Sequence, residues 1–481
     1  MKLGKACLQC RDSKRKCDRL TSSSSCLQCT RRKLHCSLLR TVVSNRPLSS
    51  FPSPTPVSQV TSRPSLPATV IEELCELYIK QIHDGPHGLF HEPTLRRDVA
   101  RGTIPDTILY GIMGLSARFS TREEVRRQCT AFGDRAKRLV KADLENVCLA
   151  NVQACILVGN ICGGEANADS ESIFFGAYHL RSEYSSFTRV CFFYFISQSD
   201  VLHVAIAMRM ARLIHLGDDL RTGDSITRET NNRVWRSLYM IDKWSAAGLG
   251  IPRQFYSDSG DRKFAIPEAK FHHAQNSNAL ESITDDGPGF WAYMIILAEI
   301  FGRIQDLNHQ LATEDLEENL IESSVESLAK SLDRFEQELP KDMQLTLENL
   351  AYHAEQGSSV PFVALHLGFH HYGTLLYFQY LDTLRPASIS KTAYSKRCKH
   401  HAAAFSELLC MSHEQNAYAA VYYIVGHMTV VSSSVLVHTL LFGEEDELPL
   451  ARQRLGSNFE ILIKLRSYWP GLKLMVSAIV K

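Results

Sequence analysis

The 481-residue sequence lacks the short motifs that mark common catalytic sites. It has no HExxH pair for a catalytic zinc, no GxSxG turn for a nucleophile, no P-loop and no glycine-rich dinucleotide motif. No apolar segment follows Met1, so we expect no export to a compartment where disulfides form. Alternating strand patterns are scarce as well, which disfavours a sheet-based fold. These absences give no support to an enzyme, although they do not exclude one.

Cysteine, by contrast, is concentrated at the start of the chain. Six of the 14 cysteines follow the pattern C-x2-C-x6-C-x8-C-x2-C-x6-C, and the unit CLQC-x6-C occurs twice. C-x2-C spacing lets two thiolates bind one zinc ion, and so short a segment needs such a staple because it cannot bury a large core. Six thiolates serve one zinc with two left over, or two zincs if two sulfurs are shared. A disulfide framework is the less favoured alternative. The candidate ligands are Cys7, Cys10, Cys17, Cys26, Cys29 and Cys36.

The same segment is strongly basic. Residues 1–40 contain eleven Lys or Arg and two Asp, a formal charge of +9, whereas the whole chain is at +1. The rest of the chain therefore carries about −8. A basic head of this kind binds polyanions by releasing counterions, so its affinity should fall steeply as salt rises. A nuclear localisation signal or a solvated basic surface would have a similar composition.

The run CRDSKRKCD at residues 10–18 resembles the C-R-x-x-K-x-K-C-D signature of the fungal binuclear zinc cluster. That cluster is the DNA-binding module of a large family of fungal transcription factors. The resemblance covers residues 7–36 and implies two Zn²⁺ ions per chain, with Cys7 and Cys26 bridging and the other four cysteines as terminal ligands. One departure is the loop 18–25, which ends in four serines where the family usually has a proline. It affects the expected loop conformation and not the expected ligand set.

In modules of this type a short helix places a few side chains in the major groove of DNA. The stretch after Cys10 supplies that helix, and Lys14 lies one turn beyond it. By resemblance, Lys14 is the expected reader of a CGG-like triplet, because an ammonium can donate to O6 and N7 of guanine. Its neighbours Arg11, Arg15 and Lys16 are expected to reach phosphates.

The second copy of the repeat predicts a second, weaker contact region. Internal symmetry places Lys33 at the point equivalent to Lys14. That lobe has Thr30 and Leu34 where the first lobe has arginines. We therefore expect the first lobe to make the base contacts and the second lobe to support it.

Residues 41–68 are the expected linker. Prolines and serines alternate there, a composition that favours extended, unpacked chain. Many relatives carry a heptad coiled coil at this place, but the stretch shows no a/d repeat and its prolines would break one. A homodimer would then use the large domain, while monomeric binding to a single half-site also stays open.

From residue 69 to 481 the sequence predicts a large all-α domain. Apolar residues recur at helical spacing in VIEELCELYIKQIH, and IPDTILYGIMGLSARFS places Pro105 and Asp106 in a first helical turn. An apolar content of 44% supports a core of this size. The fold class is thus a small two-zinc cysteine module with two short helices, followed by a large all-α domain. Further helices are expected at 290–311, 359–384, 400–412, 416–442 and 458–468.

Part of this region resembles the fungal-specific regulatory domain that follows the zinc cluster in those transcription factors. The blocks GLFHEPTLRR, ILYGIMGLSARFS, AIAMRMARLIHLG and NNRVWRSLYMIDKWSAAGLGIP come in family order and cover most of 70–260. From 270 onward the likeness lies only in being helical. Residues 177–203 interrupt the pattern, because their removal would join SIFFG to VAIAMRM as in relatives; a retained intron and a genuine insertion both explain them. Large residues of the last block are expected in the core: Trp235, Leu238, Tyr239, Ile241 and Trp244.

Two C-terminal segments suggest functions of their own. Residues 417–442 are apolar enough for a membrane span, but two histidines and three consecutive serines favour a buried core helix. GEEDELPL at 443–450 has the composition of an acidic activation segment, although an acidic solvated loop is the commoner explanation.

These features predict a nuclear, zinc-dependent, sequence-specific transcription factor at RNA polymerase II promoters, and not an enzyme. The expected partners are double-stranded DNA, the transcription machinery and a second copy through the helical domain, with no membrane association. The alternative is a zinc-stapled helical scaffold or enzyme whose basic head only localises it.

Overall fold

In a computed structural model, the chain divides into two units, Met1–Ser65 and Leu66–Lys481. The structure describes a small part of the first unit and most of the second. The described residues are 17, 26–32, 66–85, 87–165, 198–217, 223–249, 253–255, 266–281, 287–385, 388–414 and 420–473.

The described part of the second unit consists of helices and their connections, which confirms the predicted all-α class. Its first half contains α3 (Ala68–Gln81), α4 (Glu92–Ala100), α5 (Asp106–Ser116), η1 (Ala117–Phe119), α6 (Glu123–Arg126), α7 (Cys129–Ala142), α8 (Leu149–Glu165), α11 (Gln198–Leu213) and α12 (Ser225–Leu249). Its second half contains α13 (Glu268–His273), α14 (Ser277–Glu281), α15 (Phe290–Thr313), α16 (Glu318–Glu338), η3 (Lys341–Met343), α17 (Leu347–Glu355), α18 (Ser359–Tyr377), η4 (Phe378–Leu381), α19 (Ile389–Glu414), α20 (Ile424–Phe442) and α21 (Leu448–Tyr468). Across these ranges the β-type pairing is limited to an isolated bridge between His83 and His87.

Helices α3 and α5 begin close to where the sequence predicts. Each follows a proline N-cap, Pro67 or Pro105, whose fixed φ and missing N–H suit a helix start. Val70, Leu74 and Tyr78 repeat every four residues, so they share one buried face of α3. Helix α5 is buried along nearly its whole length because it packs against α3, α7 and α8.

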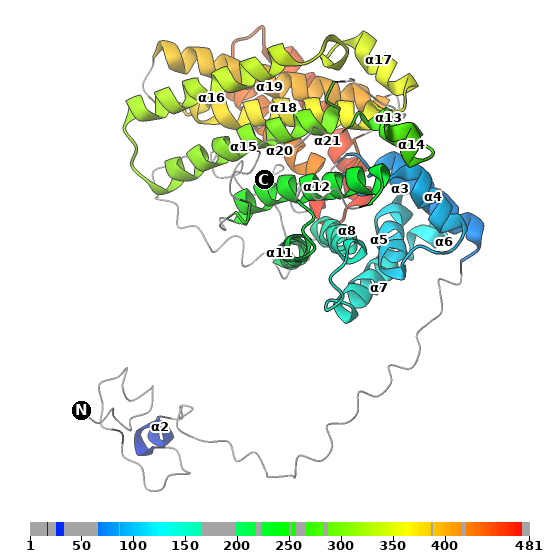
Figure 1. Ribbon diagram of the computed structural model, residues 1–481. Coiled ribbons are helices and arrows are strands. Elements are labelled where there is room, and N and C mark those ends of the chain that lie inside the picture. The colour runs from blue at the N-terminus through cyan, green and yellow to red at the C-terminus, as the bar shows by residue number, and fades with distance from the viewer. Residues whose placement is uncertain are drawn as a thin grey trace. The chain divides into compact units, whose positions relative to one another are not determined.

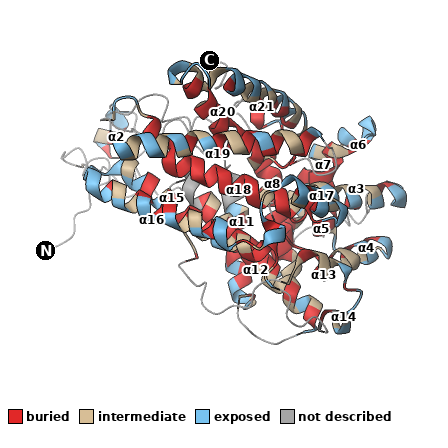
Figure 2. Cartoon of the chain, turned by 90° about the horizontal axis from the view of Figure 1, so that it is seen from above, coloured by how far each residue is buried: buried red, intermediate tan, exposed pale blue. Residues whose placement is uncertain are grey.

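The second half is built around two helices that are buried on all sides. Helices α15, α16, α18 and α19 lie side by side in the upper part of the unit (Figure 1). Helix α18 is buried throughout, and α20 is buried between α18, α19 and α21 except near its end (Figure 2). Helix α20 is long and apolar enough to span a membrane, yet 72% of its most apolar window is buried inside the protein. Helices that are apolar all round belong at the centre of a large core.

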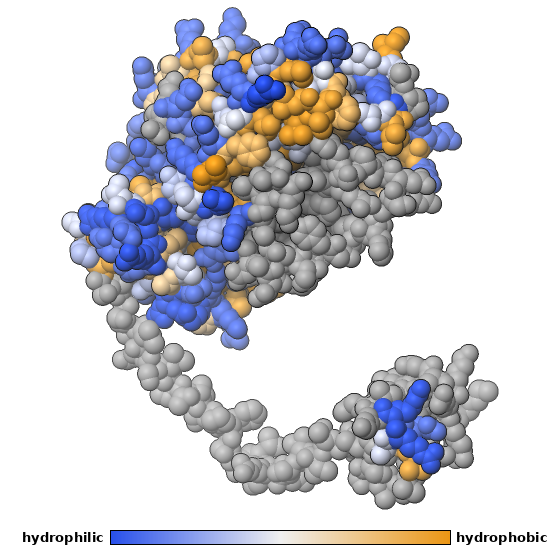
Figure 3. Space-filling view, turned by 180° about the vertical axis from the view of Figure 1, so that it is seen from behind, coloured by the Kyte–Doolittle hydropathy of each residue, from blue (hydrophilic) through white to orange (hydrophobic). Residues whose placement is uncertain are grey.

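Helix α12 connects the two halves, since it contacts α8 and α11 on one side and α15 on the other. Of the five large residues expected in the core, Leu238 and Tyr239 are buried, and Trp235, Ile241 and Trp244 are half-buried against the core. Seen from behind (Figure 3), the surface of the described residues is largely hydrophilic, and its hydrophobic side chains gather mainly in one area.

Three helices begin earlier than the sequence predicts. Helices α19 and α21 start at Ile389 and Leu448, and their extra first turns are largely exposed or half-buried. Exposed turns carry no apolar periodicity, so the sequence pattern does not reveal them. Helix α11 starts at Gln198, and residues 198–203 of the predicted insertion therefore form its first turns. The rest of that segment, 177–197, lies outside the described residues. Whether it is a retained intron or a genuine insertion therefore stays open.

The C-terminal Trp469 closes the end of α8. Its indole is buried, donates from Nε1 to the carbonyl of Val421 at 2.5 Å, and lies 3.8 Å from the guanidinium of Arg118. That guanidinium also donates to the carbonyl of Tyr468 at 3.0 Å. A Cβ on Gly164 in α8 would lie 2.2 Å from the indole ring, so this close packing requires glycine.

The substitution Gly164→Ala is expected to lower the free energy of unfolding by about 1–3 kcal/mol, because the indole cannot move without losing its other contacts. Urea denaturation followed by circular dichroism measures this. Gly456→Ala is the matched control, since that position in α21 is exposed and a Cβ there meets nothing within 4 Å. The control should be neutral or stabilising by up to about 1 kcal/mol. Equal responses at both positions would show that the indole yields without cost.

Candidate zinc cluster and a buried polar network

Two of the predicted zinc ligands lie at the start of a short helix in the first unit. Helix α2 (Leu27–Arg31) has Cys26 as its N-cap, and the Cys26 Sγ accepts the backbone N–H of Cys29 at 3.4 Å. Cys26 is 0% and Cys29 2% exposed. The C-x2-C spacing therefore places two buried cysteines within one turn of chain, and a backbone donor faces the Cys26 sulfur. This arrangement fits a thiolate-bound zinc ion.

The remaining site predictions stay predictions. Cys17 is described and half-buried. The other predicted ligands and the predicted DNA contacts lie outside the described residues: Cys7, Cys10, Cys36, Lys14, Arg11, Arg15, Lys16 and Lys33. If the cluster forms as the family pattern implies, the six cysteines would hold two Zn²⁺ ions, which would supply folding energy to a segment too short for its own core.

Helix α2 also presents two cations that the sequence reasoning did not single out. Arg31 and Arg32 are exposed at its C-terminal end, directly before the predicted contact Lys33. Thr30 is turned back on the helix, since its hydroxyl donates to the carbonyl of Cys26 at 3.2 Å. The sequence signal for these cations is the basic run Arg31, Arg32 and Lys33, of which only Lys33 was predicted as a contact.

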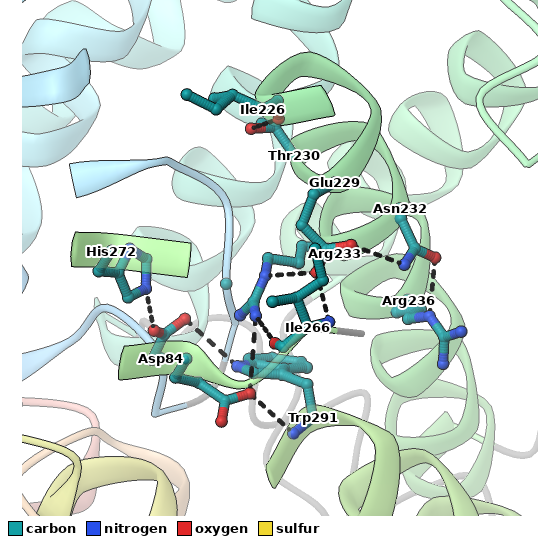
Figure 4. A network of polar contacts seen from close by, with 12 residues as sticks. Asp84, Ile226, Glu229, Thr230, Asn232, Arg233, Arg236, Ile266, His272 and Trp291 are labelled. Atoms are coloured by element: carbon teal, nitrogen blue, oxygen red, sulfur yellow. Dashed lines mark hydrogen bonds and ion pairs between the residues drawn. The ribbon is translucent and has the colours of Figure 1, made fainter. Parts of the chain in front are cut away.

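In the helical unit, Arg233 of α12 is the centre of a buried polar network (Figure 4). Its Nε donates to Glu229, one turn earlier, at 2.9 Å, and its Nη2 donates to the carbonyl of Ile266 at 2.5 Å. Glu268 lies 3.7 Å from the same guanidinium and accepts the first two backbone N–H groups of α15, at 2.9 and 3.1 Å. Burial raises the pKa of Glu268, and the charge of Arg233 opposes this only in part. The network thus ties α12 to the start of α15.

Asp84, in the loop after α3, is a second centre of this network. Its Oδ2 lies 2.6 Å from Nε2 of His272 in α13. Its Oδ1 lies 3.2 Å from Nε1 of Trp291 and 3.6 Å from Nδ1 of His83. Burial alone would raise the pKa of Asp84, but the imidazoles of His83 and His272, together with Arg233, hold it well below its ordinary value. Asp84 is therefore a buried carboxylate that accepts hydrogen bonds from α13 and α15 and lies beside His83 of its own loop.

The side chains around Asp84 have a composition that could suggest a metal site. Ligand atoms of His83, Asp84, Glu92 and His272 all lie within 4.8 Å of one another. The backbone argues otherwise, because Nε2 of His83 accepts the N–H of Phe90 at 3.2 Å and Nδ1 of His272 accepts the N–H of Glu92 at 3.4 Å. The nitrogen of each imidazole that faces Asp84 then carries a proton and has no lone pair for a metal. The cluster is thus a carboxylate held by imidazole donors.

A small apolar cavity lies beside this network. Its volume is about 50 Å³, and its wall includes Gly85, the residue after Asp84, and side chains of α12, α15, α18 and α20. Trp244 Nε1 donates to the hydroxyl of Tyr372 at 2.8 Å on the wall. Small-molecule sites typically measure about 300–1,000 Å³. The cavity is too small for such a ligand and fits a packing defect among flexible methionines.

Comparison with known proteins identifies both units. Residues 5–44 match the fungal Zn(2)-Cys(6) binuclear cluster domain. Residues 75–337, more than half of the chain, match the fungal specific transcription factor domain. The second match corrects the sequence prediction that family likeness ends near residue 260, because the blocks beyond it are too degenerate to recognise by eye.

The curated relatives are distant and much longer. Zn(2)-C6 fungal-type transcription factor FTF2 of Fusarium oxysporum f. sp. lycopersici is 19% identical over 452 residues, which cover 86% of this chain and 39% of the relative. The FTF1c factor of the same organism is 20% identical and is covered over 45% of its length. An uncharacterized transcriptional regulatory protein of Schizosaccharomyces pombe is 20% identical over 409 residues, 76% of this chain and 38% of the relative.

The chain therefore spans less than half of the length of these relatives. No solved structure matches it. The cysteine spacing, the buried pair at α2, the all-α unit and the two family matches agree, and they confirm the resemblance inferred from the sequence. The chain belongs to the fungal Zn(2)-Cys(6) transcription factors that carry a fungal specific transcription factor domain.

Proposed function

We propose that this chain is a zinc-dependent, sequence-specific DNA-binding regulator of transcription that acts in the nucleus on promoters with CGG-type half-sites. The observation that carries the proposal is the Zn(2)-Cys(6) match over residues 5–44, within a basic head whose residues 1–40 carry a formal charge of +9. Binding of the polyanionic DNA backbone follows from that charge. The family is one of transcription factors, which supports a role in regulation and not in catalysis.

Each part of the chain has its own proposed role, in the order of the sequence. Residues 1–40 bind zinc and DNA, residues 41–68 link the two domains, and residues 69–481 control the effect on transcription. Lys14 reads the triplet, and the other cations of the head contact phosphates, including Arg31 and Arg32 on α2. The partners are DNA, the transcription machinery and a second copy through the helical domain.

Selection of binding sites from random duplexes with the zinc-loaded full chain tests the proposal. Enrichment of a CGG triplet is expected. Lys14→Ala should then weaken binding to the enriched site by about 5–150-fold, equivalent to about 1–3 kcal/mol, and relax the preference for guanine. Arg40→Ala is the matched control, since it removes one positive charge outside the cysteine span and should lower affinity equally for all sequences.

Two outcomes would contradict this assignment. A flat, salt-sensitive pool would mean that the head binds DNA without reading it, and would favour the scaffold alternative. Equal losses on all sequences for Lys14→Ala would reduce that residue to a phosphate contact.

A further inference from the structure

The turn between α20 and α21 exposes large apolar side chains at the end of an otherwise buried helix. We call residues 441–450, LFGEEDELPL, the α20–α21 corner. Leu441 and Phe442 in the last turn of α20 are 64% and 61% exposed, and Leu450 in the first turn of α21 is 46% exposed. Three such side chains within ten residues differ from the singly scattered apolar residues of an ordinary surface.

The same corner is acidic. Glu444, Glu445 and Asp446 are exposed, and none of them forms an ion pair with another described residue. Glu447 is different, because it binds Lys399 of α19 at 2.6 Å. The corner therefore presents two leucines and a phenylalanine beside three negative charges that nothing in the described parts of the chain neutralises by contact.

Three hydrogen bonds also stabilise the turn of the corner. The N–H of Gly443 donates to the carbonyl of Thr439 at 2.8 Å, which closes α20. The N–H of Glu444 donates to the Glu447 carboxylate at 3.2 Å, and the N–H of Glu447 donates to the carbonyl of Glu444 at 3.0 Å. A partner would thus lose little free energy in ordering this surface.

We propose that the α20–α21 corner is a docking surface for a partner protein that presents an apolar groove rimmed by Lys or Arg side chains. Leu441 and Phe442 are the apolar anchors, and the three free acids complement the basic rim. The charge argues against a second copy of this chain as the occupant. A two-fold interface formed by the corner would bring the three acids of both copies into one small patch, and like charges that are brought together suppress association.

The inference rests on the proposed function, because the partner would belong to the transcription machinery. Through it, the DNA-bound protein would change transcription. The test uses the full chain in a fungal host with a reporter under the selected sites. One variant combines Leu441→Ala with Phe442→Ala, and a second combines Glu444→Lys, Glu445→Lys and Asp446→Lys. The control combines Leu347→Ala with Tyr352→Ala, which are 72% and 49% exposed on α17.

Both corner variants should reduce the effect of the chain on the reporter at least five-fold, with promoter occupancy and melting temperature unchanged. The control should keep the full effect. A reporter response unchanged by either corner variant would overturn the proposal, as would a response lost in the apolar variant alone, since the partner would then not be basic. Light scattering that shows a wild-type dimer and monomeric corner variants would assign the corner to a second copy and overturn it as well. If wild-type chain itself leaves the reporter unchanged, the proposed function fails and this inference fails with it.

Discussion

Removal of zinc from the full chain is expected to abolish DNA binding while the helical unit stays folded. The head cannot fold on its own apolar surface, and α2 has only five residues, far too few for an isolated helix. In small zinc modules, the metal contributes about 10–16 kcal/mol to folding. Cys29→Ala removes one of the two buried sulfurs at α2, so it should have nearly the same effect as a chelator. The expected fall in DNA affinity is at least about 100-fold.

Metal analysis and gel shift together measure this effect. Two Zn²⁺ ions per wild-type chain are expected, with loss of zinc in Cys29→Ala. Cys410→Ala is the control, because that half-buried thiol of α19 lies in the other unit and donates to Glu414. Zinc that stays bound after all six head cysteines are replaced would contradict the assignment of protonated imidazole nitrogens around Asp84.

Acid is expected to unfold the helical unit cooperatively between about pH 6.5 and pH 5. Burial lowers the pKa of four imidazoles far below the ordinary value of 6.5: to about 3 for His87 and His401 and about 4 for His366 and His427. Below pH 6.5 the unfolded chain takes up protons at these positions and the folded chain does not. Stability is therefore complete above pH 6.5 and is lost as pH falls. Each such histidine contributes about 1.4 kcal/mol of loss per pH unit, so four contribute about 6 kcal/mol by pH 5.5. That is comparable to the whole stability of a typical domain.

Urea denaturation at a series of pH values measures the number of protons taken up on unfolding. His366→Gln should reduce that number by one, and the glutamine amide can still donate to the carbonyl of Met343, as His366 Nε2 does at 2.9 Å. His309→Gln, at an exposed position of α15, is the matched control. A stability that is flat from pH 7 to 5.5 would show that these imidazoles are reached by water in the folded state.

The parts that could be predicted from sequence depend on local patterns. The cysteine spacing identified a family that the comparisons confirm, and the four-residue repeat of Val70, Leu74 and Tyr78 gave α3 with its buried face. The Arg233 network carries one local signal in the sequence, because Arg233 lies four residues after Glu229 and the two can pair on one helix face. In that block, only core residues were predicted from the sequence.

Other features have no local signal at all. Asp84 and His272 are 188 residues apart and meet only because α13 folds back over the loop after α3. The free acids and apolar side chains at 441–450 could be read as a composition, but their exposure follows from where α20 leaves the core. The predicted base contacts form only in the complex with DNA. Neither the sequence pattern nor the packing of the described residues determines them.

The contact between Arg118 and the end of α21 can form only late in synthesis of the chain. The guanidinium reaches the carbonyl of Tyr468 across 350 residues of chain. At translation rates of about 5–20 residues per second, Arg118 in the finished η1 must wait roughly 20–70 s before its partner Tyr468 is synthesised. During that interval the surface that Trp469 will cover is open to other chains. This regulator should consequently depend on chaperones while it is being made, and shortened messages that stop before Trp469 should yield aggregated protein.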